Sequence, residues 1–322
     1  MRRILITAIG GDVSCAIIRC LLEDCKQDEL YGYDIQRYTP YMDYFTVTKV
    51  APRYTDETYG AFMKEFVLKY KITHFIPATE AEILIADANM DFFKKYGVKV
   101  LINNSETIHI CTSKYLTAES LKNYGIKTPR TMEASKYRGG LSFPFILKAD
   151  YGNGGESVRI IHNQTEWDTA DKRGMVCQQK VGTNEKEYTV GVFSDGKKVN
   201  SIILKRKLGL GYGNGSSGLS VEVCCCDIPE IRNIAEKAAK ALNIVGSINI
   251  QIREEYGQFY VFEINARFSS TVGFRHKMGF KDAVWWLDMI DGVGDFPEFH
   301  SPVGKIGIKV TDDKIIKGGG NI

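Results

Sequence analysis

The stretch Val261-Phe-Glu-Ile-Asn-Ala-Arg267 places three polar residues, Glu263, Asn265 and Arg267, at every second position. In a β-strand alternate side chains leave from the same face, so these three would lie together. A carboxylate, an amide oxygen and a guanidinium on one face suit Mg²⁺ held against phosphates, because Mg²⁺ prefers hard oxygen ligands and arginine neutralises phosphoryl charge. The alternative for the same string is an edge strand with a solvated polar face.

A second strand is predicted just upstream. Residues 245–252 alternate in polarity, as do residues 258–264, and the polar run 253–257 between them has the composition of a hairpin turn. An antiparallel hairpin joined there would bring Gln251 close to the polar face of the second strand. This arrangement predicts a third oxygen ligand at the same site.

A strand followed by glycines comes earlier in the chain. Residues 143–158 read Phe-Pro-Phe-Ile-Leu-Lys-Ala-Asp-Tyr-Gly-Asn-Gly-Gly-Glu-Ser-Val, an apolar run that ends in Lys148 before a glycine-rich loop. Burying an unpaired ammonium is costly, so Lys148 is expected to have an anionic partner. The backbone N–H groups of such a loop can approach phosphate oxygens and fold over them. An ordinary hairpin turn is the alternative for the glycines alone.

Two further strings follow in order, Val176-Cys-Gln-Gln-Lys-Val181 and Lys186-Glu-Tyr-Thr-Val190. The four ordered motifs resemble those of the ATP-grasp superfamily, and most closely the ATP-binding halves of carbamoyl phosphate synthetase and its small carboxylate–amine ligase relatives. The resemblance spans roughly residues 111–290. Four motifs in order at suitable spacing are far more specific than any one of them.

The resemblance implies an α/β and α+β protein, with an N-terminal Rossmann-like pre-ATP-grasp domain before the two-lobed ATP-grasp fold. The expected boundaries are 1–109 for the first domain, 110–181 for the first lobe and 182–322 for the second lobe. The residues themselves favour a doubly wound start, because an apolar run at 3–8, a glycine turn and a helical pattern at 13–23 follow one another. The glycines do not complete a Gly-x-Gly-x-x-Gly motif, so NAD binding is a weak alternative.

The remaining pattern predicts strands that alternate with helices in the first domain, and hence a parallel sheet with right-handed crossovers. Thr79 and Glu82 lie where one such strand ends, and helix capping is favoured over substrate contact for them. The glycine-rich residues 209–218 predict a mobile loop near the acceptor substrate, since so many glycines do not suit a regular element. The expected strands are 30–34, 44–47, 74–77, 98–102 and 305–310, and the expected helices are 59–70, 82–96, 114–124, 231–242 and 281–289.

The resemblance also assigns residues to the nucleotide. Lys114, in the first turn of a helix, is poorly placed for the helix dipole unless it meets an outside anion, although a solvated lysine is the alternative. Glu187 matches the residue that holds the ribose hydroxyls, with an exposed strand carboxylate as the alternative. Gln179 stands where the family often has Glu. The full set implied to bind ATP is Lys114, Lys148, Gly154, Gly155, Ser157, Gln178, Gln179, Lys180, Val181, Glu187 and Phe262.

The chemistry implied is transfer of the γ-phosphoryl group to a carboxylate, giving an acyl phosphate that an amine attacks. Such chemistry needs positioning and charge neutralisation rather than a protein nucleophile. Gln251, Glu263 and Asn265 would ligate Mg²⁺, with Mn²⁺ as an alternative ion, and Arg267 would stabilise the transferring group. Arg206 and Arg275 are predicted to bind the acid, because arginine pairs bidentately with carboxylates.

Two departures from the family pattern leave the acid open. Ala266 replaces the usual proline, and Ser269-Ser270 replace the usual glycines. A kinase-like phosphotransferase and a nucleotide-binding module without catalysis therefore stay as alternatives to ligation.

The composition of the chain limits the classes of molecule that it is expected to bind. A net charge of +3 is too small to favour nucleic acid, and no run approaches the roughly 18 apolar residues of a membrane helix. The eight cysteines are expected to be free thiols in an intracellular chain. The sequence thus predicts a cytoplasmic enzyme of small molecules, and homodimer formation stays open.

Overall fold

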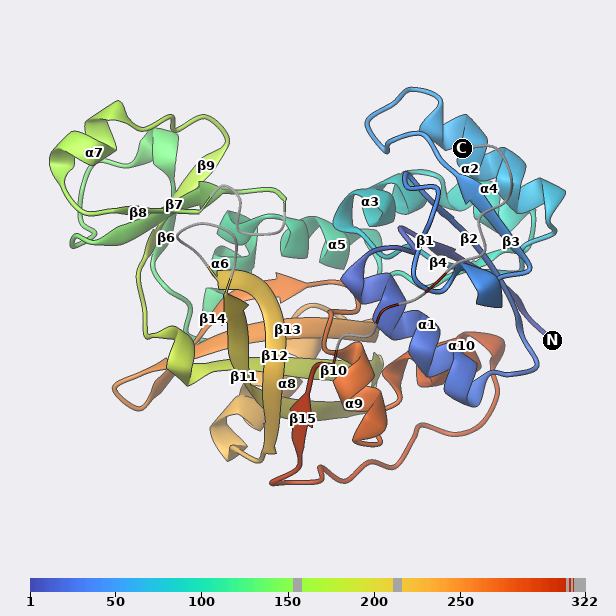
Figure 1. Ribbon diagram of the computed structural model, residues 1–322. Helices are drawn as coiled ribbons and strands as arrows, with labels where there is room; N and C mark the ends of the chain where they lie inside the picture. The colour runs from blue at the N-terminus through green and yellow to red at the C-terminus, as the bar shows by residue number, and fades with distance from the viewer. Residues whose placement is uncertain (153–157, 211–215, 311–312, 314, 316–322) are drawn as a thin grey trace.

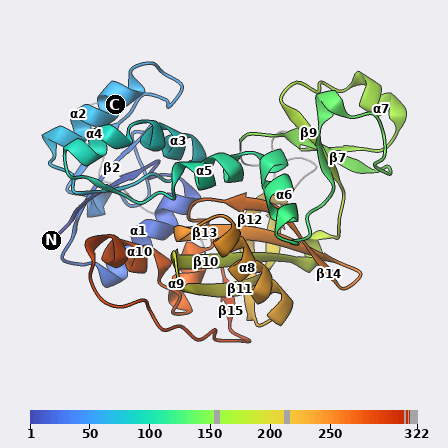
Figure 2. The same ribbon diagram turned by 180° about the vertical axis from the view of Figure 1, so that it is seen from behind.

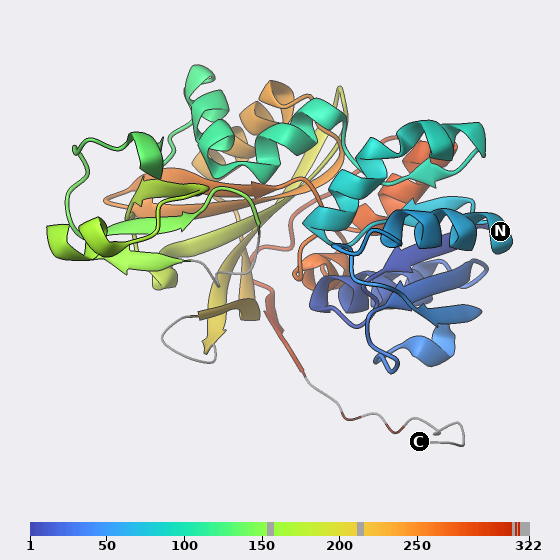
Figure 3. The same ribbon diagram turned by 90° about the horizontal axis from the view of Figure 1, so that it is seen from above.

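The computed structural model describes residues 1–152, 158–210, 216–310, 313 and 315. These residues form three β-sheets (Figure 1). Seen from above, the N-terminal sheet and the four-stranded sheet lie towards opposite ends of the molecule (Figure 3). No helix in the described part of the chain is both long enough and apolar enough to cross a membrane.

The N-terminal sheet is parallel throughout, as predicted, with the strand order β3-β2-β1-β4-β5. Its side chains alternate between two cores: Ile4 and Ile6 pack with residues of α1 and α10, whereas Leu5 packs on the opposite face with residues of α2. Burial on both faces is typical of parallel sheets covered by crossover helices. The elements are β1 (Arg3–Thr7), α1 (Asp12–Asp24), β2 (Glu29–Asp34), β3 (Val47–Val50), α2 (Tyr59–Lys69), β4 (His74–Ile76), β5 (Lys99–Val100) and α10 (Asp282–Asp291).

Two predicted elements of this region are wrong. The helix expected over residues 82–96 is two helices, α3 (Glu80–Ala88) and α4 (Met90–Lys95), because Asn89 ends the first one and its side-chain amide donates to the Ile85 carbonyl at 2.7 Å. The strand expected at 44–47 begins only at Val47, after a short 3-10 turn at Met42–Tyr44.

The four-stranded sheet is antiparallel, in the order β6-β9-β7-β8, and has a small core of its own. Phe145 and Leu147 of β7 point into that core beside Trp167 of α7. The alternate residues Ile146 and Lys148 therefore face the other way, towards the cleft. The short elements β8 and α7 carry no clear pattern in the sequence. The elements are β6 (Thr131–Glu133), β7 (Phe145–Ala149), β8 (Arg159–Ile161), α7 (Gln164–Thr169) and β9 (Met175–Gln179).

The six-stranded sheet is antiparallel, in the order β14-β13-β10-β11-β12-β15. One face packs on α8, which lies over β10 and β11 in Figure 2, and on α5 and α6. Part of the other face packs on α1, α9 and α10. The elements are α5 (Ser105–Thr112), α6 (Lys114–Asn123), β10 (Glu187–Asp195), β11 (Val199–Leu210), β12 (Ser216–Cys226), α8 (Pro229–Ala241), β13 (Val245–Glu255), β14 (Gln258–Asn265), α9 (Val272–Lys277) and β15 (Ile306–Ile308).

The predicted hairpin β13–β14 is present, with only Tyr256 and Gly257 between the strands. The loop predicted at 209–218 is wrong at its ends, because β11 continues to Leu210 and pairs there with Ser216 of β12. Residues 211–215 lie outside the described residues.

The segment around β15 contacts both the six-stranded sheet and helix α1 near the N-terminus. β15 pairs with β12 at the sheet edge, and the Lys309 ammonium just after it donates to Asp12 in the first turn of α1. At the base of the N-terminal sheet, Arg2 likewise donates to Asp288 at 2.6 Å and to Asp291 at 2.7 Å in α10.

A buried ion pair lies between the six-stranded sheet and the C-terminal helices. Arg275 of α9 has no exposed surface, and its guanidinium donates to Asp282 of α10 at 2.7 Å. The arginine lies against Gly191 of β10, where an added Cβ would meet Arg275 Nε at 2.8 Å and Cδ closer still. Strand β10 therefore needs glycine at this position.

Replacing Gly191 by alanine is expected to lower the free energy of unfolding by about 1–3 kcal/mol, because the buried arginine must shift to admit the methyl group. Gly60→Ala in α2 is the matched control, since nothing lies within 4 Å of its added Cβ and alanine favours a helix. Urea denaturation of both variants checks this. An unchanged midpoint for Gly191→Ala would show that Arg275 can move away freely.

Candidate active site

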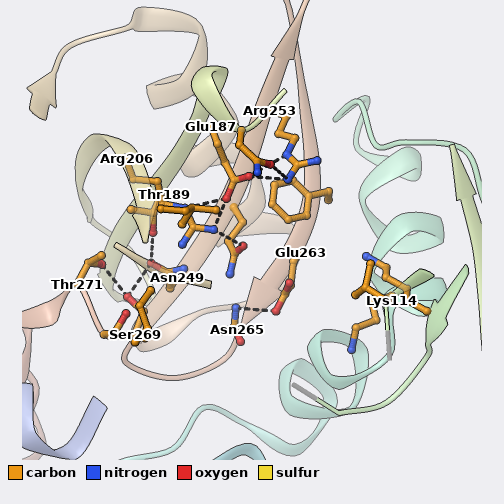
Figure 4. Close-up of a pocket in the computed structure, with 18 of the residues that line it drawn as sticks. Lys114, Glu187, Thr189, Arg206, Asn249, Arg253, Glu263, Asn265, Ser269 and Thr271 are labelled. Carbon is orange, nitrogen blue, oxygen red and sulfur yellow. Dashed lines mark hydrogen bonds and ion pairs between the residues drawn. The ribbon is translucent and has the colours of Figure 1, made fainter. Parts of the chain in front are cut away.

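A cleft of about 1330 Å³ lies where the three sheets meet. Each sheet or its helices contribute lining residues, among them Lys148 from β7, Glu263 from β14 and Asp12 from α1. Figure 4 shows that Lys114 lies across the cleft from Glu263 and Asn265. The floor of the cleft is the half of the six-stranded sheet that the C-terminal helices leave uncovered.

The predicted metal ligands come together through strand register. Gln251 pairs with Glu263, and Asn249 pairs with Asn265, across β13 and β14. The Asn265 amide donates to Glu263 Oε1 at 3.2 Å, and Arg206 donates to Gln251 Oε1 at 2.9 Å. The hairpin predicted from polarity alone therefore places three oxygen-bearing side chains side by side.

These side chains fit a hard cation. Glu263 Oε2 and Asn265 Oδ1 accept no hydrogen bond from the described residues. The Gln251 oxygen has a second lone pair beside its bond to Arg206. Within the described part of the chain, no group of three or more His, Cys, Asp or Glu side chains could hold a metal. The set has one carboxylate and two amides, which suits Mg²⁺ because this ion keeps several waters and phosphate oxygens in its shell.

Lys148 is a buried cation for which the described residues supply no hydrogen bond or ion pair. Its side chain, in a residue only 7% exposed, makes no hydrogen bond or ion pair with the described residues, and its ammonium lies 6.0 Å from the Phe262 ring centroid. Burial lowers the pKa of Lys148 to about 8, although the nearby Glu263 carboxylate raises it in part. The anionic partner expected from the sequence is therefore absent from the described chain, and a phosphate in the cleft would supply it.

Lys114 begins α6, and Ser113 before it caps the helix. The Lys114 ammonium donates to the Gly152 carbonyl at 2.6 Å, directly before residues 153–157. The predicted phosphate-loop residues Gly154, Gly155 and Ser157 lie outside the described residues. Lys114 and Lys148 both line the cleft, as predicted for two phosphate-binding lysines.

Glu187 is 1% exposed, so the alternative of an exposed strand carboxylate is wrong. Arg206 of β11 donates to its Oε1 through Nε at 2.8 Å, and Arg253 of β13 donates to its Oε2 at 2.8 Å (Figure 4). Arg206 is thus engaged by Glu187 and by Gln251. These bonds use Nε and Nη2 of a residue that also lines the cleft, and its contact with the acid substrate stays a prediction.

The second arginine predicted for the acid is misplaced. Arg275 is completely buried against Asp282 and does not line the cleft. The neighbouring His276 is buried too, and its Nε2 lies 3.2 Å from Asp24 Oδ2. Arg267, by contrast, does line the cleft, and its Nε has no hydrogen-bond partner among the described residues. Arg267 keeps its predicted place beside the metal ligands.

A row of hydroxyl groups was missed by the sequence reasoning. Thr189 and Ser269 donate to Asn249 Oδ1 at 2.7 Å and 2.9 Å, and the hydroxyls of Ser269 and Thr271 are 2.8 Å apart. All four residues line the cleft. The signal was the two-residue spacing from Asn249 to Gln251, which places both side chains on one strand face.

At the end of β4, Thr79 and Glu82 form a capping box for α3, and the favoured prediction is confirmed. Burial raises the pKa of the Glu82 carboxyl, which also accepts hydrogen bonds from Thr7 at 2.7 Å and Tyr59 at 2.9 Å. Thr79 lines the cleft, but its hydroxyl is engaged by the helix cap.

Residues 178–181, which the resemblance implies bind ATP, form one wall of the cleft. Gln178 and Gln179 end β9, and Lys180 and Val181 follow them; all four line the cleft. Gln178 donates to the Thr131 hydroxyl at 2.9 Å, and Gln179 Oε1 accepts from the Arg130 N–H at 3.3 Å. Both amides are therefore held by the segment that leads into β6.

Comparison with known proteins identifies the family. The sequence model of the ATP-grasp domain family matches residues 111–271, which is half of the chain. The chain therefore belongs to the ATP-grasp family, as the motif order predicted.

Curated relatives are carbamoyl phosphate synthase large chains. The C-terminal section of that chain from Aquifex aeolicus is 29% identical over 201 residues, which cover 57% of this chain and 37% of the relative. The large chain from Campylobacter jejuni is 26% identical over 200 residues, covering 56% of this chain and 18% of the relative. This chain thus matches well under half the length of these relatives.

Solved structures share the fold. L-amino acid ligase from Bacillus licheniformis has a TM-score of 0.70 at 17% identity, covering 90% of this chain and 74% of the other. The biotin carboxylase domain of Hydrogenobacter thermophilus 2-oxoglutarate carboxylase, in complex with MgADP and bicarbonate, has a TM-score of 0.69 at 18% identity, covering 91% and 70%. At such identities the likeness extends to the fold.

Replacing Lys148 by methionine removes the buried charge and keeps a side chain of similar length. Because the pKa of Lys148 falls from 10.5 to about 8 in the folded protein, its charge destabilises the fold at pH 7. We expect Lys148→Met to raise the free energy of unfolding at pH 7 by about 1–3 kcal/mol without nucleotide. This gain should shrink as the pH rises from 8 to 10.5, where lysine loses its proton in the unfolded chain too.

The same variant is expected to bind Mg-ATP at least about tenfold more weakly, since a buried cation facing phosphate oxygens is lost. Lys237→Met on the exposed side of α8 is the control for both measurements. Calorimetric titration and urea denaturation check the pair. A tighter fold with unchanged ATP affinity would remove Lys148 from the phosphate site.

Proposed function

We propose that the protein is an ATP-dependent ligase that joins a carboxylate to an amine through an acyl phosphate, with Mg-ATP bound in the cleft. The observation that carries the proposal is Lys148, a buried ammonium with no partner in the described chain, facing the oxygen ligands Glu263 and Asn265. A metal-bound polyphosphate matches both features, because its phosphate oxygens would pair with the lysine and its metal ion would bind the carboxylate.

The proposed domain organisation follows the three sheets. Residues 1–109 would form a Rossmann-like pre-ATP-grasp domain, 110–181 the first ATP-grasp lobe and 182–322 the second. The parallel order β3-β2-β1-β4-β5 supports the first assignment. Helix α10 is an exception to simple boundaries, because it lies in the third range but packs on the first sheet.

We assign different parts of the proposed reaction to different residues of the cleft. Lys114 and Lys148 would hold phosphate oxygens, while Gln178 to Val181, Glu187 and Phe262 would surround the nucleoside. Gln251, Glu263 and Asn265 would ligate Mg²⁺, or Mn²⁺ in its place, and the ion would neutralise charge on the transferring phosphoryl group. Arg267, with an unpaired buried Nε, would bind the same phosphoryl group from the other side.

The acid has to lie within about 3–3.5 Å of the γ-phosphorus for in-line transfer. Arg275 lies outside the cleft, and Arg206 already pairs with Glu187 and Gln251. Further donors are the hydroxyls of Ser269, Ser270 and Thr271 and the first turn of α1, which line the cleft together with Asn265. We propose this corner for a small carboxylate and an amine, in a cytoplasmic enzyme without nucleic-acid or membrane partners. The eight cysteines are free thiols, which supports a reducing compartment.

An isotope experiment tests the proposal. Candidate acids carrying ¹⁸O in the carboxylate are incubated with the protein, Mg-ATP and an amine panel, and the released phosphate is analysed by mass spectrometry. Ligation through an acyl phosphate moves one ¹⁸O into phosphate. A stable phosphorylated product without labelled phosphate would indicate a kinase-like enzyme instead, and no ADP formation with any acid would indicate a binding module.

Glu263→Gln is expected to lower turnover about 100-fold or more while changing ATP affinity only several-fold, because the metal matters most where charge develops in the transition state. Glu236→Gln on the exposed face of α8 is the control. ADP release under saturating substrates and a separate ATP titration check this. Turnover within a few fold of the unaltered protein would remove Glu263 from the metal site.

A further inference from the structure

The buried arginine Arg275 reaches the edge of the cleft floor from the covered part of the same sheet face. Its Nη2 donates to Asp282 at 2.7 Å, and its Nη1 donates to Asn249 Oδ1 at 3.4 Å. Asn249 of β13 and Gly191 of β10 are cross-strand partners. The guanidinium lies where Gly191 has no side chain, since an added Cβ would meet Arg275 Nη1 at 2.9 Å. Arg275 therefore contacts Asn249 without lining the cleft itself.

The contact with Arg275 fixes the orientation of the Asn249 amide. Thr189 and Ser269 also donate to Asn249 Oδ1, at 2.7 Å and 2.9 Å. A hydroxyl can donate or accept, so these two residues would fit either orientation of the amide. A guanidinium only donates, and a reversed amide would set its own nitrogen against Arg275 Nη1. Of these three neighbours, Arg275 is the one that requires the amide oxygen on its side.

The amide nitrogen of Asn249 is consequently presented to the cleft. Asn249 is 1% exposed and lines the cleft, and its Nδ2 has no hydrogen-bond partner among the described residues. This nitrogen is also not one of their fully enclosed unpaired atoms.

The neighbouring amide has the opposite orientation. Asn265 is the partner of Asn249 across the hairpin, and both are labelled in Figure 4. Asn265 donates through Nδ2 to Glu263, and its Oδ1 accepts no hydrogen bond from the described residues. Side by side on the cleft floor, Asn265 therefore offers an oxygen and Asn249 offers an N–H donor. A metal-bound phosphate suits this pair, because the metal takes the oxygen and a phosphate oxygen takes the donor.

We propose that Arg275 is a positioning residue that holds the Asn249 amide so that its nitrogen donates to an oxygen of the γ-phosphoryl group. The same orientation keeps Asn249 out of the metal shell, to which its oxygen would otherwise be suited. The inference rests on the proposed function, in which Mg-ATP binds in this cleft. The ion that Asn265 would ligate neutralises the transferring phosphoryl group, so the donor beside Asn265 lies next to that group. Asn249 would contact the nucleotide, and Arg275 would act through Asn249.

Equilibrium titration with Mg-ATP and with Mg-ADP tests the inference, because the two nucleotides differ only in the γ-phosphoryl group. Asn249→Asp replaces the amide nitrogen by an oxygen and keeps an acceptor for Arg275, Thr189 and Ser269. We expect the ratio of ATP affinity to ADP affinity to fall at least about tenfold in this variant, since the donor is lost and a carboxylate oxygen faces the phosphate. A general loss of packing would weaken both nucleotides alike and leave the ratio unchanged.

Arg275→Lys separates the positioning role from the ion pair. Lysine keeps a positive charge for Asp282, but its single nitrogen cannot donate to Asp282 and Asn249 from the two ends of a planar fork. The Asn249 amide is then free to turn over, and the affinity ratio should fall at least about threefold. Asp282→Asn is the matched control, because it removes the partner charge and leaves the Arg275 Nη1 donor in place. The ratio should be retained in this control.

Thermal unfolding without nucleotide checks that each variant is folded. If Arg275→Lys does not fold, Arg275→Met combined with Asp282→Asn replaces it with the same expectation, since this double variant buries no charge.

An affinity ratio in Asn249→Asp within about twofold of the unaltered protein would overturn the contact with the γ-phosphoryl group and leave the proposed function intact. An unchanged ratio in the folded Arg275 variant, or an equal fall in Asp282→Asn, would overturn the positioning role of Arg275. No binding of either nucleotide to the unaltered protein would overturn the inference together with the proposed function.

Discussion

One face of the six-stranded sheet serves two purposes, and the rest of the structure depends on where they meet. Towards one end of the strands this face packs on α1, α9 and α10; towards the other it is polar and forms the cleft floor. The buried pair Arg275–Asp282 lies at the boundary, against Gly191. A buried ion pair with both partners in place is tolerated where removing either partner would not be. This ion pair separates the apolar core from the polar cleft on one face of a single sheet.

The charged side chains of the cleft also differ in whether the described residues supply a partner of opposite charge. Glu187 is neutralised on both sides by arginines from the neighbouring strands, so the protein satisfies this carboxylate internally. Lys148, on β7 of the four-stranded sheet, has no hydrogen bond or ion pair with the described residues, and its lowered pKa means that its charge costs stability. Sites that bind charged ligands commonly keep such unbalanced groups, because the ligand supplies the balance.

Strand faces were the most predictable part of this protein. The period-two spacing of Glu263 and Asn265 and the hairpin back to Gln251 hold, because both follow from local strand geometry. Arg267, predicted on the same strand face, lies two residues past the end of β14, although it still lines the cleft. The assignment of Arg275 to the acid is wrong, because the sequence shows a charge but not its partner, Asp282. Glu187 lies 19 residues from Arg206 along the chain, and only sheet register brings them together. Ion pairing across strands depends on that register, which composition and periodicity leave open.

The placement of α10 has a consequence for synthesis on the ribosome. The N-terminal parallel sheet needs this helix, residues 282–291, to cover one of its faces, and Arg2 pairs with Asp291 across 289 positions of sequence. Domains usually fold as they emerge, from the N-terminus onwards. Here α1 covers part of that face early, whereas the part that α10 covers stays open until residues 282–291 have followed. Its completion is coupled to the last helix, and such long-range closure is slow relative to local pairing. The emerging chain therefore has to keep this surface protected from other chains for most of its translation.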